Sequence, residues 1–149
     1  MSKIRLMTMS DYDGVYELWT NTPGMGLNNL DDSRAGIEKY LNRNPRTCFV
    51  AEDDNAGIVG VILCGNDGRR GYIHHTAVKT TERKRGIGTS LVNAAMDALQ
   101  NEGITKAALV VFADNELGDG FWERLGFTVR EDLNYRNKTL DGRLVRMDT

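Results

Sequence analysis

Residues 78–91 join the end of an apolar strand to the start of a long helix through a basic turn, Val78-Lys79-Thr80-Thr81-Glu82-Arg83-Lys84-Arg85-Gly86-Ile87-Gly88-Thr89-Ser90-Leu91. The N-terminus of a helix presents unpaired N–H groups and the positive end of the helix dipole, so it can hold a phosphate. Gly86 and Gly88 lack the Cβ that would keep an anion away from the backbone. Three cationic side chains lie beside them, Arg83, Lys84 and Arg85. The local charge favours a pyrophosphate ligand, and the alternative is a solvated basic turn before a helix.

Two common nucleotide-binding motifs do not fit this turn. A dinucleotide fingerprint needs a third glycine where Leu91 stands, and the Gly-Lys-Ser/Thr of a P-loop occurs nowhere in the chain. The sequence therefore favours neither NAD nor ATP as the ligand.

Length and composition bound the class of protein. The chain has 149 residues, of which 40% are hydrophobic and 27% are charged, and 19 basic against 21 acidic side chains give a net charge of −2. This composition is typical of a globular protein, and we expect one domain over residues 1–149. The nearly balanced charge supplies no general attraction to nucleic acid or to an anionic lipid surface.

The sequence also indicates the compartment. No apolar run reaches the roughly 20 residues of a membrane span, and the N-terminal stretch turns acidic where a signal peptide would be apolar. We therefore expect a cytoplasmic protein. Cys48 and Cys64 lie inside apolar runs and are expected to be buried free thiols.

Hydrophobic periodicity predicts strands and helices along the whole chain. Ser10 and Asp13 resemble a capping box that opens the first helix. The predicted strands are 4–7, 47–52, 57–64, 72–78, 107–112, 126–129 and 135–147, the last being either a hairpin or one long edge strand; the predicted helices begin at Ser10 and cover 32–41, 86–102 and 116–125. This order indicates one mixed sheet with helices on both faces.

A second motif lies downstream of the basic turn. A strand ends near Asn115, and a short helix runs into Trp122-Glu123-Arg124-Leu125-Gly126-Phe127. With these residues the chain resembles the GCN5-related N-acetyltransferase (GNAT) family, most of all its small bacterial single-domain members, including those similar to ribosomal-protein alanine acetyltransferases. The family's central signature, Arg/Gln-x-x-Gly-x-Gly/Ala, is filled by residues 83–88. Its second signature, Asn followed by a helix into Tyr-Glu-x-Leu-Gly-Phe, is matched except at the aromatic position.

The resemblance implies an α/β fold, with a mixed, centrally splayed sheet of about six or seven strands and helices on both faces. It also implies acetyl-CoA as cosubstrate, without a metal. The residues that it implies for acetyl-CoA are Val78, Arg83, Lys84, Arg85, Gly86, Gly88, Thr89, Asn115 and Trp122. The pyrophosphate would lie on backbone N–H groups of the turn and helix start, and the pantetheine arm between Val78 and Asn115. Asn115 is equally suited to cap a helix, and the two roles are compatible.

Acyl transfer to an amine needs a base, because an aliphatic amine with a pKa near ~10.4 is protonated at neutral pH. His74 and His75 are neighbours on the strand that ends at Val78, so we expect them to point to opposite faces, with at most one in the slot and no shared metal ion. The resemblance implies a base at His74 or Tyr72, and we choose His74; the alternative is a structural histidine. Trp122 stands where the family often has the Tyr that protonates the departing thiolate, and an indole N–H cannot give up its proton near neutral pH.

The sequence thus predicts an acetyl-CoA-dependent N-acetyltransferase that acts on a primary amine of a small molecule or a protein N-terminus. We expect loop 21–29 and the first two helices to recognise the amine. Acidic residues there either attract a cation or start helices, namely Asp11, Asp13, Glu17, Asp31 and Asp32.

Two other classes of function stay open. One is a non-catalytic acyl-CoA-binding sensor or interaction module on the same fold. The other is a nucleic-acid binder that uses Arg69, Arg70 and the basic turn, which the net charge disfavours. The expected partner is the amine substrate, a small molecule or peptide, with no nucleic acid or membrane, and a homodimer is compatible with this class.

Overall fold

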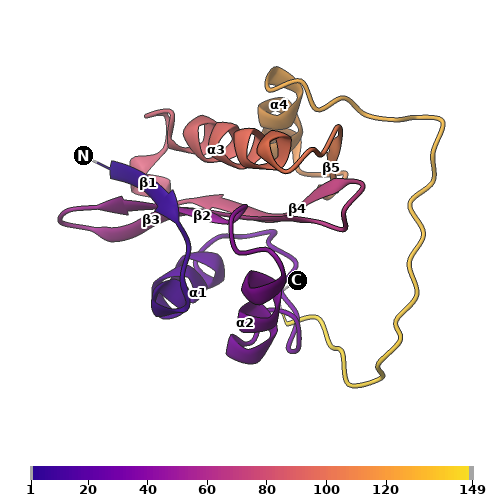
Figure 1. Ribbon diagram of the computed structural model, residues 1–149, viewed down its shortest axis with the longest axis horizontal. Helices are drawn as coiled ribbons and strands as arrows, with labels where there is room; N and C mark the ends of the chain where they lie inside the picture. The colour runs from indigo at the N-terminus through magenta and orange to yellow at the C-terminus, as the bar shows by residue number, and fades with distance from the viewer. Residues whose placement is uncertain (1, 148–149) are drawn as a thin grey trace.

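A five-stranded sheet lies between two layers of helices (Figure 1). The structure is a computed structural model that describes residues 2–147, so residues 1, 148 and 149 of the expected domain lie outside the described residues. The elements are β1 (Ser2–Leu6), η1 (Met9–Asp11), α1 (Tyr12–Thr20), α2 (Arg34–Arg43), β2 (Phe49–Asp53), β3 (Gly57–Asn66), β4 (Gly71–Val78), η2 (Thr80–Glu82), α3 (Ile87–Asn101), β5 (Ala107–Leu109) and α4 (Glu116–Arg124). The strand order is β1-β2-β3-β4-β5, with β4 and β5 parallel and the other pairs antiparallel. The predicted α/β class with helices on both faces is confirmed.

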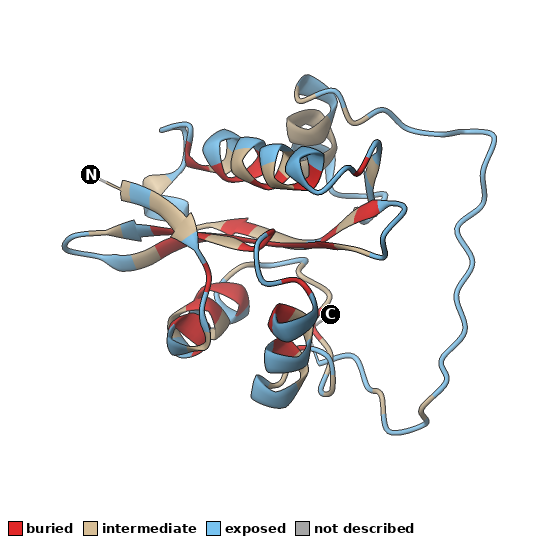
Figure 2. Ribbon diagram, viewed as in Figure 1, coloured by how far each residue is buried: buried red, intermediate tan, exposed pale blue. Residues whose placement is uncertain are grey.

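Each face of the sheet has its own apolar core (Figure 2). On one face α1 and α2 bury Trp19 and Ile37, and on the other α3 buries Leu91 and Ala95. These residues recur at helical spacing, which gives each helix one apolar side. Among the residues described, no helix combines the length and the apolar character needed to cross a membrane.

Cys48 and Cys64 are buried free thiols, as the sequence predicts. Burial raises the pKa of each to about 12. Neither cysteine therefore forms a thiolate near neutral pH, and both act as small core residues.

The sheet opens between its last two strands, as predicted. β4 and β5 pair only through residues Gly71–Ile73 and Ala107–Leu109. β4 continues to Val78, where it still pairs with Gly60 of β3, whereas β5 has ended. The end of β4 is therefore bordered by a gap where a central strand would usually have a second neighbour.

The strand count is lower than the six or seven predicted. Residues 126–129 and 135–147 form no strand of the sheet, and β5 ends at Leu109 rather than at 112. The reason lies at the end of the chain: the Met147 amide donates to the Leu27 carbonyl at 2.9 Å, and Arg146 forms an isolated bridge with Asn28. This end is held on the α1–α2 side and does not lie along β5 (Figure 1).

Two helix starts differ from the prediction. The capping box is formed by Thr8 and Asp11, not by Ser10 and Asp13, and it opens η1 directly before α1. The second helix begins at Arg34, with the Ser33 hydroxyl accepting the Gly36 amide at 3.1 Å. Asp32, predicted within that helix, precedes it and takes part in the site described next.

Candidate functional site

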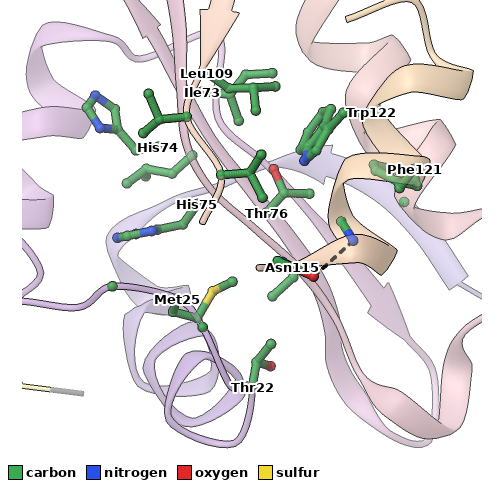
Figure 3. Close-up of a pocket in the computed structure, with 18 of the residues that line it drawn as sticks. Thr22, Met25, Ile73, His74, His75, Thr76, Leu109, Asn115, Phe121 and Trp122 are labelled. Atoms are coloured by element: carbon green, nitrogen blue, oxygen red, sulfur yellow. Dashed lines mark hydrogen bonds between the residues drawn. The ribbon is translucent and has the colours of Figure 1, made fainter. Parts of the chain in front are cut away.

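One cavity of about 1680 Å³ follows the opening between β4 and β5 (Figure 3). It brings together every residue that the sequence predicts for the site except Arg85: its lining includes Tyr72, His74, Val78, Arg83, Lys84, Gly86, Gly88, Thr89, Asn115 and Trp122. The lining also includes His75 and Thr76, which the sequence did not assign to the site, and Asp32, one of the acidic residues expected either to attract a cation or to start a helix.

The start of α3 forms one end of the cavity. Gly86 precedes the helix with φ of 78°, a left-handed conformation that glycine adopts without strain, and it has no side chain to accept the N–H groups of the first turn. At Gly88 a Cβ would stand 3.2 Å from the Phe121 ring, so a glycine keeps this passage open. The helix start thus presents backbone donors to the cavity, as an anion site requires.

The three cationic side chains of the basic turn before α3 do not all face the cavity. Arg83 donates from Nε to the Val78 carbonyl at 3.2 Å, which ties the turn to the end of β4. Arg85 lies 3.6 Å from Glu82, and its side chain is 69% exposed. Lys84 lines the cavity with φ of 68°, an uncommon value for a residue with a Cβ. Arg83 and Lys84 therefore face the cavity, and Arg85 adds charge from outside it.

Asn115 caps α4. Its Oδ1 accepts the Gly118 amide at 3.0 Å, drawn as the dashed line in Figure 3. Because the cap uses the oxygen, the side-chain NH₂ stays available as a donor in the cavity lining. The predicted cap is confirmed, and the ligand role is sterically compatible with it.

The two histidines lie on the same face of the sheet, so the prediction that they point to opposite faces is wrong. The pairing of β3 and β4 shifts there: Leu63 faces His75 and Cys64 faces Ile73, leaving His74 as an extra residue in a β-bulge. The His74 ring contacts the Tyr40 ring of α2 at 5.3 Å, and the His75 ring contacts the Trp19 ring of α1 at 5.0 Å. Strand alternation fails because the bulge inserts one residue.

His75 forms a buried pair with Asp32. Its Nε2 lies 2.8 Å from Asp32 Oδ1, with side chains only 10% and 4% exposed. Asp32 Oδ2 accepts the Asn28 amide at 2.8 Å, and the Tyr12 hydroxyl donates to the Asp32 carbonyl. Since Nε2–H donates to the carboxylate, Nδ1 is the acceptor nitrogen; it is buried and has no partner among residues 2–147. The pair thus holds a buried, unpartnered acceptor nitrogen on a residue that lines the cavity.

His74 lies in a different environment. Its ring stands 4.7 Å from the Tyr72 ring, at the edge of the same cavity. Desolvation, and then the neighbouring His75, lower the pKa of His74 below its usual value. Desolvation, and then Tyr135, raise the pKa of Tyr72. Both groups are therefore neutral near pH 7. The choice of His74 as the base stays a prediction.

Thr76 and Trp122 line the cavity on its α3–α4 side (Figure 3). Thr76 pairs with Ile62 of β3, whose side chain belongs to the core under α3. The Oγ1 of Thr76 is buried and has no hydrogen-bond partner within the described chain. The Trp122 ring packs edge-on against Phe121 at 5.0 Å and Phe127 at 5.2 Å. Trp122 thus packs in an aromatic cluster, and Thr76 adds a polar group beside the gap.

Comparisons with known proteins identify the family and agree with the fold. Residues 12–127 match the acetyltransferase (GNAT) family. An acetyltransferase of Pectobacterium atrosepticum is 30% identical over 141 residues, which cover 95% of this chain and 98% of that protein. Ard1 from Thermoplasma volcanium superposes with a TM-score of 0.76 at 21% identity, covering 87% of this chain and 84% of that one. The PaiA N-acetyltransferase from Thermoplasma acidophilum, in complex with coenzyme A, superposes with a TM-score of 0.74 at 18% identity, covering 97% and 95%. The chain therefore belongs to the acetyltransferase (GNAT) family, and it is an acyltransferase.

Proposed function

We propose that this chain transfers the acetyl group of acetyl-CoA to a primary amine, on a small molecule or on a protein N-terminus. The observation that carries the proposal is the cavity that joins the start of α3 to the buried His75–Asp32 pair. At about 1680 Å³ it exceeds the ~300–1000 Å³ of a typical small-ligand pocket. It therefore has room for a cosubstrate and an acceptor together.

The α3 end of the cavity fits the phosphates of acetyl-CoA. Backbone N–H groups at Gly86, Gly88 and Thr89 would hold the pyrophosphate, assisted by the cations of the turn. The Val78 backbone and the Asn115 amide would hold the pantetheine arm, because both border the gap where β4 has lost its neighbour. When bound there, the thioester supplies an activated acetyl group.

The opposite end of the cavity fits the amine. His75 Nδ1 would accept the proton that the amine loses as its nitrogen attacks the thioester carbon, and Asp32 would stabilise the imidazolium that forms. Asp31, exposed at the cavity edge, would attract the cationic form of the amine before deprotonation. His74 and Tyr72 would form the cavity wall next to the amine.

The sulfur of CoA can leave without a proton donor at position 122. As the C–S bond breaks, CoA leaves as a thiolate, and a thiol with a pKa near ~8.5 is readily protonated by water at neutral pH. The Thr76 hydroxyl, buried beside the gap, would donate a hydrogen bond to the thiolate or the thioester oxygen.

CoA release tests the proposed function. Purified protein is incubated with acetyl-CoA and a panel of primary amines and peptides, and free thiol is measured together with the mass of the acceptor. At least one acceptor class should raise thiol release above the rate of hydrolysis and gain one acetyl group. CoA binding without transfer to any amine would favour the sensor function, and failure to bind CoA would overturn the assignment of the cavity.

Replacing Trp122 by Tyr tests whether the aromatic residue limits the reaction. The smaller ring still packs against Phe121 and Phe127, so we expect CoA affinity within about threefold of the wild type, that is ~0.65 kcal/mol. Turnover should be equal or higher, because a phenol can protonate the thiolate. Calorimetry with CoA and steady-state rates measure the two effects. A large loss of CoA affinity would instead make the indole a packing element that the site requires.

The basic turn should make CoA binding sensitive to salt. Exposed ion pairs contribute ~0.2–1 kcal/mol each and are screened by ions, so replacing Arg83, Lys84 and Arg85 by Ala should weaken CoA about threefold to a hundredfold and flatten the salt dependence. Arg69→Ala/Arg70→Ala removes charge from the exposed β3–β4 turn and is the control. Titrations at several ionic strengths measure the slope, and an equally steep slope in the triple variant would place the phosphates elsewhere.

A further inference from the structure

Two cationic side chains of α2 line the cavity. Lys39 and Arg43 stand about one helical turn apart, and both are exposed. Within residues 2–147, neither of these side chains forms an ion pair or a hydrogen bond. Arg34, at the start of the same helix, is by contrast paired with Asp13. The two cations of α2 that face the cavity are therefore the ones without a carboxylate partner in the described part of the chain.

This arrangement costs the helix stability. Like charges at positions i and i+4 of a helix repel each other. The helix dipole favours a cation in the last turn, where Arg43 stands, but the second cation at Lys39 adds repulsion one turn earlier. An anion held between the two side chains would remove this repulsion.

α2 runs along β4, away from the His75–Asp32 pair. The pair joins β4 to the residues just before the helix. After the helix, Asn44 Oδ1 accepts the Asn66 amide at 2.9 Å, and Asn66 pairs with Gly71 at the start of β4. The second half of α2, with its two cations, therefore lies beyond the proposed base, towards the start of β4.

The length of the helix sets the distance between the acidic and the basic groups. At a rise of 1.5 Å per residue, Lys39 and Arg43 stand about 9 and 15 Å along the axis from the N-cap Ser33. Helical side chains lean back towards the start of their helix, so a group held between the two cations would lie about 8–12 Å from Asp31 and Asp32. A free α-amino acid cannot span this distance, because its amine and its carboxylate share one carbon atom.

The phosphates of CoA do not account for these cations. In the proposed site they lie at the start of α3, which covers the face of the sheet opposite to α2 (Figure 1). Arg83 and Lys84 already line the cavity at that end. Lys39 and Arg43 therefore belong to the part of the cavity that receives the acceptor.

We infer that the acceptor is a primary amine that carries a carboxylate about 8–12 Å from its nitrogen. The inference rests on the proposed function and names its substrate class. Asp31 and His75 receive the amine. Lys39 and Arg43 hold the carboxylate, which suits the paired N–H donors of a guanidinium. The acetyl group passes to the amine nitrogen as CoA leaves, and the carboxylate takes no part in the reaction.

Two kinds of molecule have this chemistry: an ω-amino acid, and a peptide N-terminus that is followed closely by an acidic residue. A diamine of the same length has the opposite charge at its far end. It would place a second cation against Lys39 and Arg43 and would be repelled. The charge at the far end of the acceptor is therefore the property to vary.

Matched acceptors give the first test. Straight-chain primary amines that end in a methyl group, a carboxylate or a second amine are compared at several lengths, with acetyl-CoA and the full chain. At the fitting length, kcat/KM for the carboxylate compound should exceed that for the methyl compound about twofold to thirtyfold, as expected from two exposed ion pairs. The diamine should be the poorest acceptor. Peptides with Asp or Asn at the second or third position then distinguish the two sources.

Variants of α2 test the two cations directly. Lys39→Gln/Arg43→Gln should remove the preference for the carboxylate compound, and Lys39→Glu/Arg43→Glu should reverse it in favour of the diamine. Arg46→Glu makes the same kind of charge change just after α2, at an exposed residue outside the cavity lining, and should keep the wild-type preference. An unchanged preference in the Gln variant would overturn the inference, whether or not the Glu variant folds.

Binding separates this inference from the proposed function. Calorimetry with the same amines on the CoA-bound protein measures affinity without acetyl transfer. If the methyl compound and the diamine are acetylated as fast as the carboxylate compound, the inference fails and the proposed function stands. If no amine is acetylated, the proposed function fails. A carboxylate preference in binding that is lost in the Gln variant would still support the assignment of the two cations, and equal binding of all three compounds would overturn it.

Discussion

Gly88→Glu should abolish CoA binding in a protein that still folds. At this position a Cβ stands 3.2 Å from the Phe121 ring and 3.6 Å from Val78, so the side chain must project into the passage where the phosphates would lie. The carboxylate would then repel them and occupy the N–H donors of the first turn. A negative charge at a helix start favours the helix, which offsets the steric cost in the folded state.

The effect is measured as loss of thermal stabilisation. A ligand at 100 times its dissociation constant adds about 2.7 kcal/mol to the stability of the protein that binds it, and this shift should vanish in Gly88→Glu. Asn93→Glu adds the same charge to the exposed side of α3 and should keep the full shift. Unchanged CoA affinity in a folded Gly88→Glu protein would show that the pyrophosphate does not bind at the start of α3.

The cofactor end of the site could be predicted from sequence because its chemistry is local. A helix start, two glycines and a basic turn lie within residues 83–88, and the backbone supplies the ligand contacts. The structure accordingly places these residues, apart from Arg85, around one cavity. The strong periodicity of α3 likewise located that helix to within a residue at each end.

The amine end could not be predicted in the same way, because it depends on contacts between distant residues. His75 and Asp32 are 43 positions apart, and the sequence left open whether Asp32 attracts a cation or starts a helix. Strand alternation assigned the two histidines to opposite faces, and one extra residue in the β-bulge reversed that result. The one available signal was composition: two histidines next to the strand end, with acidic residues in the loop before α2.

The prediction of strands near the C-terminus was wrong for a related reason. Residues 126–129 and 135–147 have the alternation of strands, but a strand forms only where a partner offers its edge. In this structure the backbone hydrogen bonds of Val145 with Asn29 and of Met147 with Leu27 hold these residues on the α1–α2 side of the sheet. The local pattern therefore predicted strands that this structure does not form, because a pattern within one segment cannot identify a partner strand.

His75→Gln should lower the rate of acetyl transfer by about a hundredfold to ten-thousandfold, the usual contribution of a general base. Gln can keep a hydrogen bond to Asp32 but cannot accept a proton, so the pair keeps its packing against Trp19 and loses its chemistry. CoA affinity should not change, because His75 lies at the other end of the cavity from α3. Steady-state rates and calorimetry with CoA measure the two effects.

His74→Gln is the matched control, since His74 is the neighbouring residue on the same face of the sheet. If His75 is the base, the His74 variant keeps both its rate and its pH profile. Asp32→Asn should retain part of the rate, because the amide oxygen still accepts a hydrogen bond from Nε2 but no longer stabilises a positive charge. The opposite result, with His74→Gln losing the rate and His75→Gln keeping it, would assign the base to His74 and leave the His75–Asp32 pair as the contact that holds the loop before α2 against β4.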